Sequence, residues 1–193
     1  MNKDFAIYLQ TNAEVTTTQL AQLEKKIVQR TISKGEYVLR KGDTCKQVFY
    51  VEKGLLRFYS IDHFGKEHII QFAPEGWFIS DRSSIYFNEP SEYYIDAIEE
   101  STVVTMDDQF VCTLSEMSPS FTKYNDQLLQ KHIRHLQKRI NLLIGATAEE
   151  RYLDFIKSYP DLTQRVPQWM IASYLGITPE SLSRVRKELV KKS

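Results

Sequence analysis

The sequence predicts an α+β protein in which a double-stranded β-roll of the jelly-roll type precedes one long helix and a C-terminal helix-turn-helix. Three patterns indicate this fold. Short apolar runs separated by glycines fill residues 31–105, an apolar heptad repeat covers 129–143, and residues 168–187 carry the residue types that two crossed helices require. The changes of hydrophobic period predict three domains, over residues 1–117, 118–145 and 146–193.

Composition places the chain among soluble globular proteins. Its 193 residues are enough for one large or two small cores, with 42% hydrophobic and 26% charged residues. No stretch approaches the roughly 20 apolar residues that cross a bilayer. The N-terminus lacks a basic region followed by an apolar run, so we expect no secretory signal, no membrane partner and a cytoplasmic location.

The residues that carry enzyme or metal chemistry are sparse. Cys45 and Cys112 are too few for a disulfide framework or for the four thiolates of an iron-sulfur cluster, so we expect free thiols. An oxidant-sensing role for Cys45 and a haem ligand remain open. The four histidines fall on a hairpin and on the long helix, which argues against a metal-dependent cupin. Neither a glycine-rich phosphate loop nor a nucleophile elbow occurs, so the sequence predicts no enzyme, metal or cofactor.

The N-terminal part is expected to be helical up to about residue 30. A cluster of threonines at 16–18 precedes Gln19, Leu20, Leu23 and Ile27, which form a short amphipathic stretch. From residue 31 the pattern changes to strands, with glycines at roughly ten-residue intervals, as turns of a compact β-roll require. The predicted strands are 37–39, 48–51, 55–59, 68–72, 93–98 and 102–106.

A long helix is predicted from about residue 118 to 144. Its apolar residues follow each other at steps of four and three, which is the seam of a two-stranded parallel coiled coil. The stripe is narrow because lysines and arginines flank it, so we expect two copies of the chain to pair. The alternative is a helix that lies on its own β-domain. The expected dimer contacts are Leu129, Ile133, Leu136, Ile140 and Leu143.

A helix-turn-helix is predicted after a capping box at 147–150, which starts a helix over 149–158. Ala172 is the small residue where the two helices cross, and Gly176 supplies a left-handed turn. Thr178 can cap the second helix, and Pro179 stands at its first position, where a missing N–H costs nothing. The alternative is an ordinary pair of surface helices in which Glu180 and Arg184 form an ion pair.

The outer face of the second helix carries groups that fit DNA. Glu180 can accept from a cytosine amino group, and Arg184 can donate to guanine O6 and N7 one helical turn away. Thr178 and the first N–H groups can hold a phosphate. From Gly176 onward five basic residues face two acidic ones, although the whole chain has no net charge. The expected DNA contacts are Gln168, Thr178, Pro179, Glu180, Ser181, Ser183, Arg184, Arg186, Lys187 and Lys191.

This order of elements resembles the Crp/Fnr family of bacterial transcription regulators over nearly the whole chain. The recurring turns of the family resemble residues 32–43, 50–55 and 65–67, and residues 74–79 look like the strand that leads into its effector pocket. The resemblance implies a winged helix-turn-helix and a homodimer with paired long helices. It also implies a β-roll that holds a small effector, regulated binding to palindromic double-stranded DNA, and RNA polymerase as a partner.

The effector pocket departs from the cyclic-nucleotide-binding members, which hold the ribose with a Gly-Glu pair and the cyclic phosphate with an Arg-Ser pair. Here Ser80-Asp81 and Ser91-Glu92 stand at those places, so a carboxylate replaces the positive partner and repels phosphate. The sequence therefore predicts no tight binding of cyclic AMP, unless Arg82 moves in. An unknown effector would contact Trp77, Ser80, Asp81, Arg82, Ser91, Glu92 and Tyr94.

Two other functions stay open. The chain is alternatively a cyclic-nucleotide-responsive regulator with a divergent pocket, or a module whose C-terminal helices bind protein instead of DNA. Salt separates DNA from protein as the partner, because neutralising phosphates makes affinity fall steeply with salt, whereas an apolar interface does not.

Overall fold

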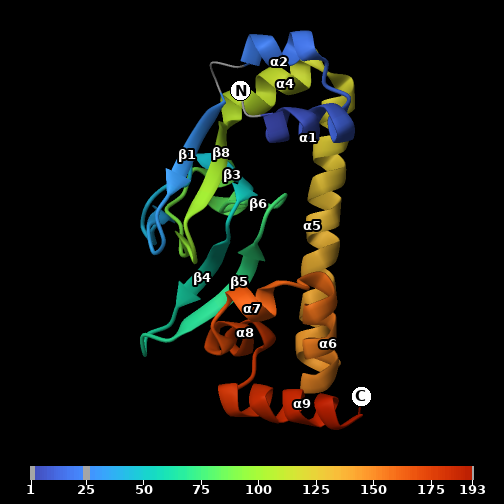
Figure 1. Ribbon diagram of the computed structural model, residues 1–193. Helices are drawn as coiled ribbons and strands as arrows, with labels where there is room; N and C mark the ends of the chain where they lie inside the picture. The colour runs from blue at the N-terminus through green and yellow to red at the C-terminus, as the bar shows by residue number, and fades with distance from the viewer. Residues whose placement is uncertain (1–2, 24–26, 193) are drawn as a thin grey trace. The chain divides into compact units, whose positions relative to one another are not determined.

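The computed structural model describes residues 3–23 and 27–192 (Figure 1). Two helices open the chain, α1 (Lys3–Ala13) and α2 (Thr17–Leu23), and strand β1 (Val28–Ile32) follows. The prediction of helix up to residue 30 is therefore wrong for residues 28–30, and residues 24–26 lie outside the described part. Val28 pairs with Thr105 of another strand, so sheet pairing outweighs the local apolar spacing.

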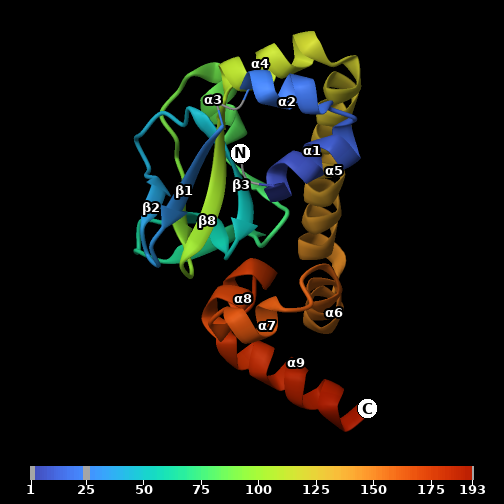
Figure 2. The same ribbon diagram turned by 45° about the horizontal axis from the view of Figure 1, so that its top comes forward.

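The β-roll consists of two four-stranded sheets, ordered β1-β8-β3-β6 and β2-β7-β4-β5. Figure 2 shows β1, β8 and β3 running side by side. All six predicted strands are confirmed, and the short β6 is added within the segment 74–79. After β1, the bounds are β2 Tyr37–Leu39, β3 Gln47–Lys53, β4 Leu56–Ile61, β5 Glu67–Ala73, β6 Phe78–Ile79, β7 Tyr94–Ala97 and β8 Ser101–Asp107.

Two short helices of the roll were not predicted, α3 (Arg82–Phe87) and α4 (Asp108–Met117). Each begins at an aspartate whose side chain caps it. Asp81 accepts a hydrogen bond from the Ser84 N–H at 3.1 Å, and Asp107 accepts one from the Phe110 N–H at 2.8 Å. These caps are the sequence signal that could have located both helices.

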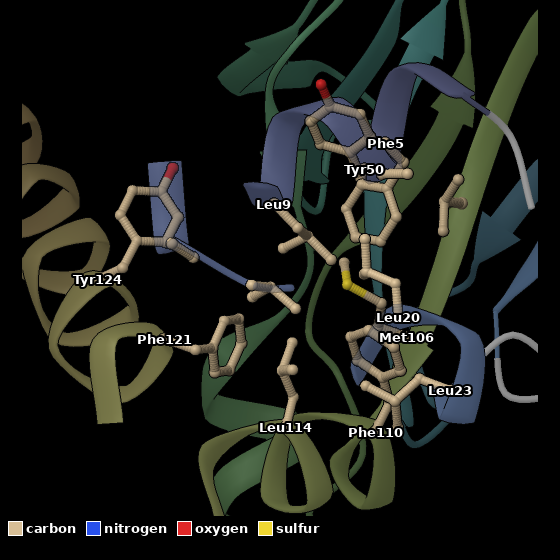
Figure 3. Packing of buried hydrophobic residues seen from close by; sticks show 14 residues of the cluster. Phe5, Leu9, Leu20, Leu23, Tyr50, Met106, Phe110, Leu114, Phe121 and Tyr124 are labelled. Carbon is tan, nitrogen blue, oxygen red and sulfur yellow. The ribbon is translucent and has the colours of Figure 1, made fainter. Parts of the chain in front are cut away.

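One apolar cluster joins α1, α2 and α4 to the first turns of the long helix α5 (Pro119–Gly145). Figure 3 shows Leu114 of α4 and Phe121 and Tyr124 of α5 pointing into the same interior as Phe5 and Leu9 of α1. The apolar side of the predicted amphipathic stretch, with Leu20 and Leu23, is thus part of this core. Within the roll, the facing positions of both sheets form a second apolar core.

The remaining helices are α6 (Ala148–Ser158), α7 (Leu162–Arg165), α8 (Gln168–Leu175) and α9 (Pro179–Lys192). The long helix and the helix-turn-helix are as predicted, and the capping box at Thr147 and Glu150 is present. Helix α7 was not predicted. The resemblance implies a winged helix-turn-helix, in which a β-hairpin accompanies the helices. Residues 108–192 contain no strand, so they contain no such hairpin. No helix within the described residues is long and apolar enough to cross a membrane.

The described residues form two compact units. The N-terminal unit comprises residues up to 60 together with 71–130, and the C-terminal unit comprises residues 61–70 together with those from 131 onward. The tip of the β4–β5 hairpin therefore belongs to the unit that carries the helix-turn-helix. No local pattern in the sequence indicated this assignment.

Candidate nucleic-acid interface and effector pocket

The turn between α8 and α9 has the geometry that its residue types predict. Gly176 adopts a left-handed backbone with φ of +65°, and its N–H donates to the Ala172 and Ser173 carbonyl oxygens. Ala172 is buried where the helices cross. A Cβ on Gly176 would lie 3.1 Å from the Leu143 Cδ2 atom, so the position also demands a small residue.

Helix α9 begins at Pro179, with Thr178 before it. The Thr178 hydroxyl accepts a hydrogen bond from the Ser181 N–H at 3.2 Å, as predicted for the cap. Leu182 and Val185 are buried, so they form the inner face of α9. The expected cap, turn and core positions of the helix-turn-helix are therefore all occupied as the sequence indicates.

The predicted DNA contacts lie on the outer side of the helices. Hydrogen bonds from its own N–H and from Thr178 lower the pKa of Glu180, so this carboxylate is an acceptor at neutral pH. No ion pair joins Glu180 to Arg184 in the described part of the chain. The contact that the alternative of two ordinary surface helices predicts is therefore not formed. Ser181, Ser183 and Arg186 are half-buried, and the exposed ones are Gln168, Thr178, Pro179, Glu180, Arg184, Lys187 and Lys191.

Within the C-terminal unit, α8 is bound to the hairpin tip. The Ser173 hydroxyl donates to the Glu67 carbonyl at 2.9 Å and accepts from the Ile69 N–H at 3.0 Å. Arg139 of α5 donates to the Ile69 carbonyl at 2.8 Å and to that of Ile70. These contacts join residues that lie 69 to 106 positions apart in the sequence, so sequence reasoning missed them.

Hydrogen bonds connect two segments of the predicted effector pocket. Asp81 Oδ2 accepts from the Ser91 hydroxyl at 2.7 Å, and both residues are buried. The Ser84 hydroxyl donates to the Glu89 carbonyl and accepts from the Cys45 N–H at 2.8 Å. The structure therefore joins the two segments that were expected to hold an effector, but it joins them directly to each other.

The other predicted pocket residues differ in their burial and in their contacts. Glu92 is exposed and pairs with Lys41 at 2.8 Å, and Arg82 is exposed at the start of α3. Ser80 is half-buried, Trp77 packs partly buried against the roll core, and Tyr94 stacks on a neighbouring tyrosine of the sheet.

Sequence reasoning missed a buried ion pair in the β2-β7-β4-β5 sheet. Arg57 contacts Asp96 through two hydrogen bonds of 2.7 and 2.8 Å, and the two residues are only 7% and 5% exposed. The Tyr59 hydroxyl donates to the same carboxylate at 3.2 Å, and burial raises the pKa of Tyr59. Arg57 and Asp96 are register partners on β4 and β7, which only the strand pairing reveals.

The two free cysteines differ in burial. Cys45 is buried, and burial raises the pKa of its thiol, whereas Cys112 is exposed on α4. A raised pKa keeps Cys45 in its less reactive thiol form at neutral pH. Among the residues that the structure describes, no group of three or more His, Cys, Asp and Glu side chains could hold a metal ion.

Known proteins with similar sequences are regulators by name. Residues 29–115 match the cyclic nucleotide-binding domain. The transcriptional activator protein anr of Pseudomonas aeruginosa is 28% identical over 167 residues, 81% of this chain and 68% of that protein. Electron transport regulator A of Shewanella oneidensis is 27% identical over 183 residues, 89% of this chain and 72% of that protein. Neither relative is named as an enzyme.

Solved structures share the fold. FixK2 from Bradyrhizobium japonicum superposes with a TM-score of 0.74 at 19% identity, covering 86% of this chain and 85% of FixK2. A mutant of CooA from Carboxydothermus hydrogenoformans gives 0.69 at 20% identity, covering 94% of this chain and 88% of that protein. The arrangement of β-roll, long helix and C-terminal helices is thus found in other proteins.

Proposed function

We propose that this chain is a transcription regulator of the Crp/Fnr type, and that it binds a palindromic DNA site as a homodimer with helix α9. A small effector other than cyclic AMP tunes this binding. The observation that carries the proposal is the exposed face of α9, where Glu180 and Arg184 stand one turn apart without pairing to each other.

Base recognition falls to the first turns of α9. The ionised Glu180 accepts from a cytosine amino group, and Arg184 donates to guanine. Ser181 and Ser183 lie close enough in sequence to contact the same bases or their phosphates. Gln168 at the start of α8 and Pro179 border this face.

Phosphate contacts orient the helix without reading sequence. The hydroxyl of Thr178 and the N–H groups after it lie at the positive end of the α9 dipole, which attracts a phosphate. Arg186, Lys187 and Lys191 follow along the helix and attract the DNA backbone by releasing counterions.

The apolar stripe of α5 supports the dimer. Ile133, Ile140 and Leu143 are 47%, 56% and 40% exposed, which is unusual for large apolar side chains that repeat along one helix. Leu129 and Leu136 are half-buried on the same seam. A second copy would cover this stripe, and a two-fold dimer would read half-sites about one helical turn apart.

The effector is proposed to be something other than cyclic AMP. The Ser91 hydroxyl donates to the buried carboxylate of Asp81, so a negative charge lies where a cyclic phosphate would need a positive partner. We also propose that the chain works in the cytoplasm with RNA polymerase. Residues 1–117 would sense, 118–145 would dimerise and 146–193 would bind DNA.

Selection of sites from random DNA by the purified protein tests the proposal. We expect a palindromic site, and an affinity that falls steeply with salt. Arg184→Ala should cost about 1–3 kcal/mol at one base position, whereas Lys187→Ala should weaken all sequences alike. Equal losses in both variants on specific and random DNA would contradict the assigned roles. A salt-independent protein partner and no DNA binding would overturn the function.

Dimerisation is tested by sedimentation of the full chain. The wild-type protein should sediment as a dimer, and Ile140→Glu should shift it to a monomer because the charge faces the seam. Lys131→Glu is the matched control, since that exposed residue flanks the stripe. A monomeric wild-type protein would remove the basis for a palindromic site.

A further inference from the structure

We infer that the C-terminal unit contains an anion-binding pocket between α5, α6 and α8, which accepts one carboxylate or phosphate group of a small molecule. The pocket is lined by residues of these three helices only. It is separate from the β-roll residues and from the outer face of α9. The binding itself does not depend on the proposed function.

The charged residues of this pocket are predominantly positive. Lys138 and Arg139 come from α5 and Arg151 comes from α6, whereas Asp154 is the single carboxylate among the residues that line it. Asp154 already forms an ion pair with Lys138. Burial and the charge of Arg139 lower the pKa of His135, which also lines the pocket. Two guanidinium charges therefore remain without a carboxylate.

Both arginines also have a structural role, which offsets part of their positive charge. Arg139 donates to the Tyr174 carbonyl at 3.0 Å, and Arg151 donates to the Leu175 carbonyl at 2.7 Å. These carbonyls belong to the last turn of α8. The carbonyl groups at the end of a helix have no N–H partner within the helix. The end of a helix dipole carries only about half a negative charge. Two full positive charges exceed it, so the pocket keeps a positive balance.

Both arginines also keep an unused donor. The Nε atoms of Arg139 and Arg151 are buried and have no hydrogen-bond partner among the described residues. A buried donor without an acceptor is costly, and in most folded proteins such a group has a partner. An oxyanion would supply acceptors for these donors and would neutralise the remaining charge in one step.

The pocket is small, which limits what enters it. Its volume of about 20 Å³ is that of one or two water molecules. A ligand would therefore insert a single charged group and keep the rest of its structure outside. Leu142, Leu143 and Phe155 form an apolar wall, so the attached part of the ligand is expected to be apolar rather than a further charge.

The location of the pocket implies that its ligand regulates DNA binding. This step rests on the proposed function. The ligand would touch α5, which carries the dimer seam, and the end of α8, which positions the turn before α9. Occupancy would therefore favour one arrangement of these helices and change the affinity for DNA.

Phosphorus NMR of inorganic phosphate with the full-length protein, at constant ionic strength set by chloride, tests the site. We expect saturable binding, and a binding constant about tenfold or more weaker in Arg151→Gln, because a charged donor is lost. A parallel competition with acetate separates carboxylate from phosphate as the preferred group. Displacement of phosphate by acetate favours carboxylate, and no displacement favours phosphate.

Three further variants keep the test decisive. Asp154→Asn removes the repelling carboxylate and should tighten phosphate binding, so its effect has the opposite sign and does not depend on whether Arg151→Gln folds. Arg134→Gln on the exposed face of α5 and Arg184→Gln on the DNA face should leave phosphate binding unchanged.

Loss of binding in Arg184→Gln but not in Arg151→Gln would place the anion on the DNA face and overturn the inference. Absence of saturable binding in the wild-type protein would overturn it as well. DNA binding is measured separately in chloride, so a protein that binds DNA but not phosphate contradicts only this inference.

Discussion

The two units bury arginine in different ways. In the N-terminal unit, Arg57 faces the carboxylate of Asp96 through two short hydrogen bonds, and the charge is neutralised inside the fold. In the C-terminal unit, the hydrogen bonds of Arg139 and Arg151 go to carbonyl oxygens. An arginine that is paired with a carboxylate has a structural role, and its charge is no longer available to a ligand. An arginine that donates only to carbonyl oxygens keeps its net positive charge. This contrast directs the search for an anion to the helices rather than to the β-roll.

The largest effect on stability is expected from breaking the buried ion pair of Arg57 and Asp96. Asp96→Ala leaves Arg57 buried without a counter-charge, so the free energy of unfolding should fall by about 3–5 kcal/mol in urea denaturation. The double variant Arg57→Met with Asp96→Leu removes both charges and should recover most of this loss. If the single variant is as stable as the wild-type protein, the pair is not buried as the structure shows.

A smaller effect is expected from Arg139, whose removal leaves no opposite charge behind. Arg139→Met deprives the Ile69, Ile70 and Tyr174 carbonyls of a donor and should lower the free energy of unfolding by about 2–3 kcal/mol. Arg139→Lys keeps the charge but not the planar fork, so it should recover only part of the loss. A loss larger than that of Asp96→Ala would reverse the comparison between the units.

The left-handed backbone at Gly176 ends α8, and this does not depend on the hydrogen bonds from Arg139 and Arg151. Gly176→Ala places a side chain at φ of +65° and against Leu143, which should cost about 1–2 kcal/mol of unfolding free energy. Gly145→Ala is the control, because a Cβ there would meet nothing within 4 Å and its φ is not in the left-handed region. Equal effects in both variants would mean that the turn tolerates a side chain.

The smallest effect concerns the half-buried carboxylate of Asp62 at the hairpin tip. Hydrogen bonds from His68 and from the Lys66 and Phe64 N–H groups lower the pKa of Asp62 to about 2. Because the folded pKa lies below the unfolded value of about 4, its stabilising contribution is complete above pH 4 and disappears as the pH falls towards 2. Carboxyl NMR should show this titration, and His68→Gln should raise the pKa of Asp62. An ordinary pKa in the wild-type protein would contradict these contacts.

Much of the fold was predictable because its signals are local. The glycine at 176, the threonine cap at 178 and the buried Leu182 each act within a few residues, so the helix-turn-helix is legible from the sequence. The strands follow from alternation between turns. The prediction of helix is wrong for residues 28–30 because the identity of β1 depends on pairing with β8, a partner about seventy residues away.

The candidate sites were less predictable because their contacts are long-range. The substitution of Ser91 for a cation was visible, but its hydrogen bond to Asp81 depends on how α3 and the following loop fold. The sequence predicts only that lysines and arginines, among them Arg139, flank the apolar stripe of the long helix. The acceptors of Arg139 on β5 and α8 are brought to it only by the tertiary structure. The pocket of the C-terminal unit therefore had no signal in the sequence.

The hairpin tip at residues 61–70 makes the C-terminal unit discontinuous along the chain. A fragment cut out at residue 131 would lack the two backbone partners of Ser173 and the Ile69 and Ile70 acceptors of Arg139. Such a fragment would expose polar groups that the intact chain satisfies. Dissection of this protein by truncation should therefore yield a weakened helical piece, and a faithful isolated version would have to carry the hairpin grafted back onto it.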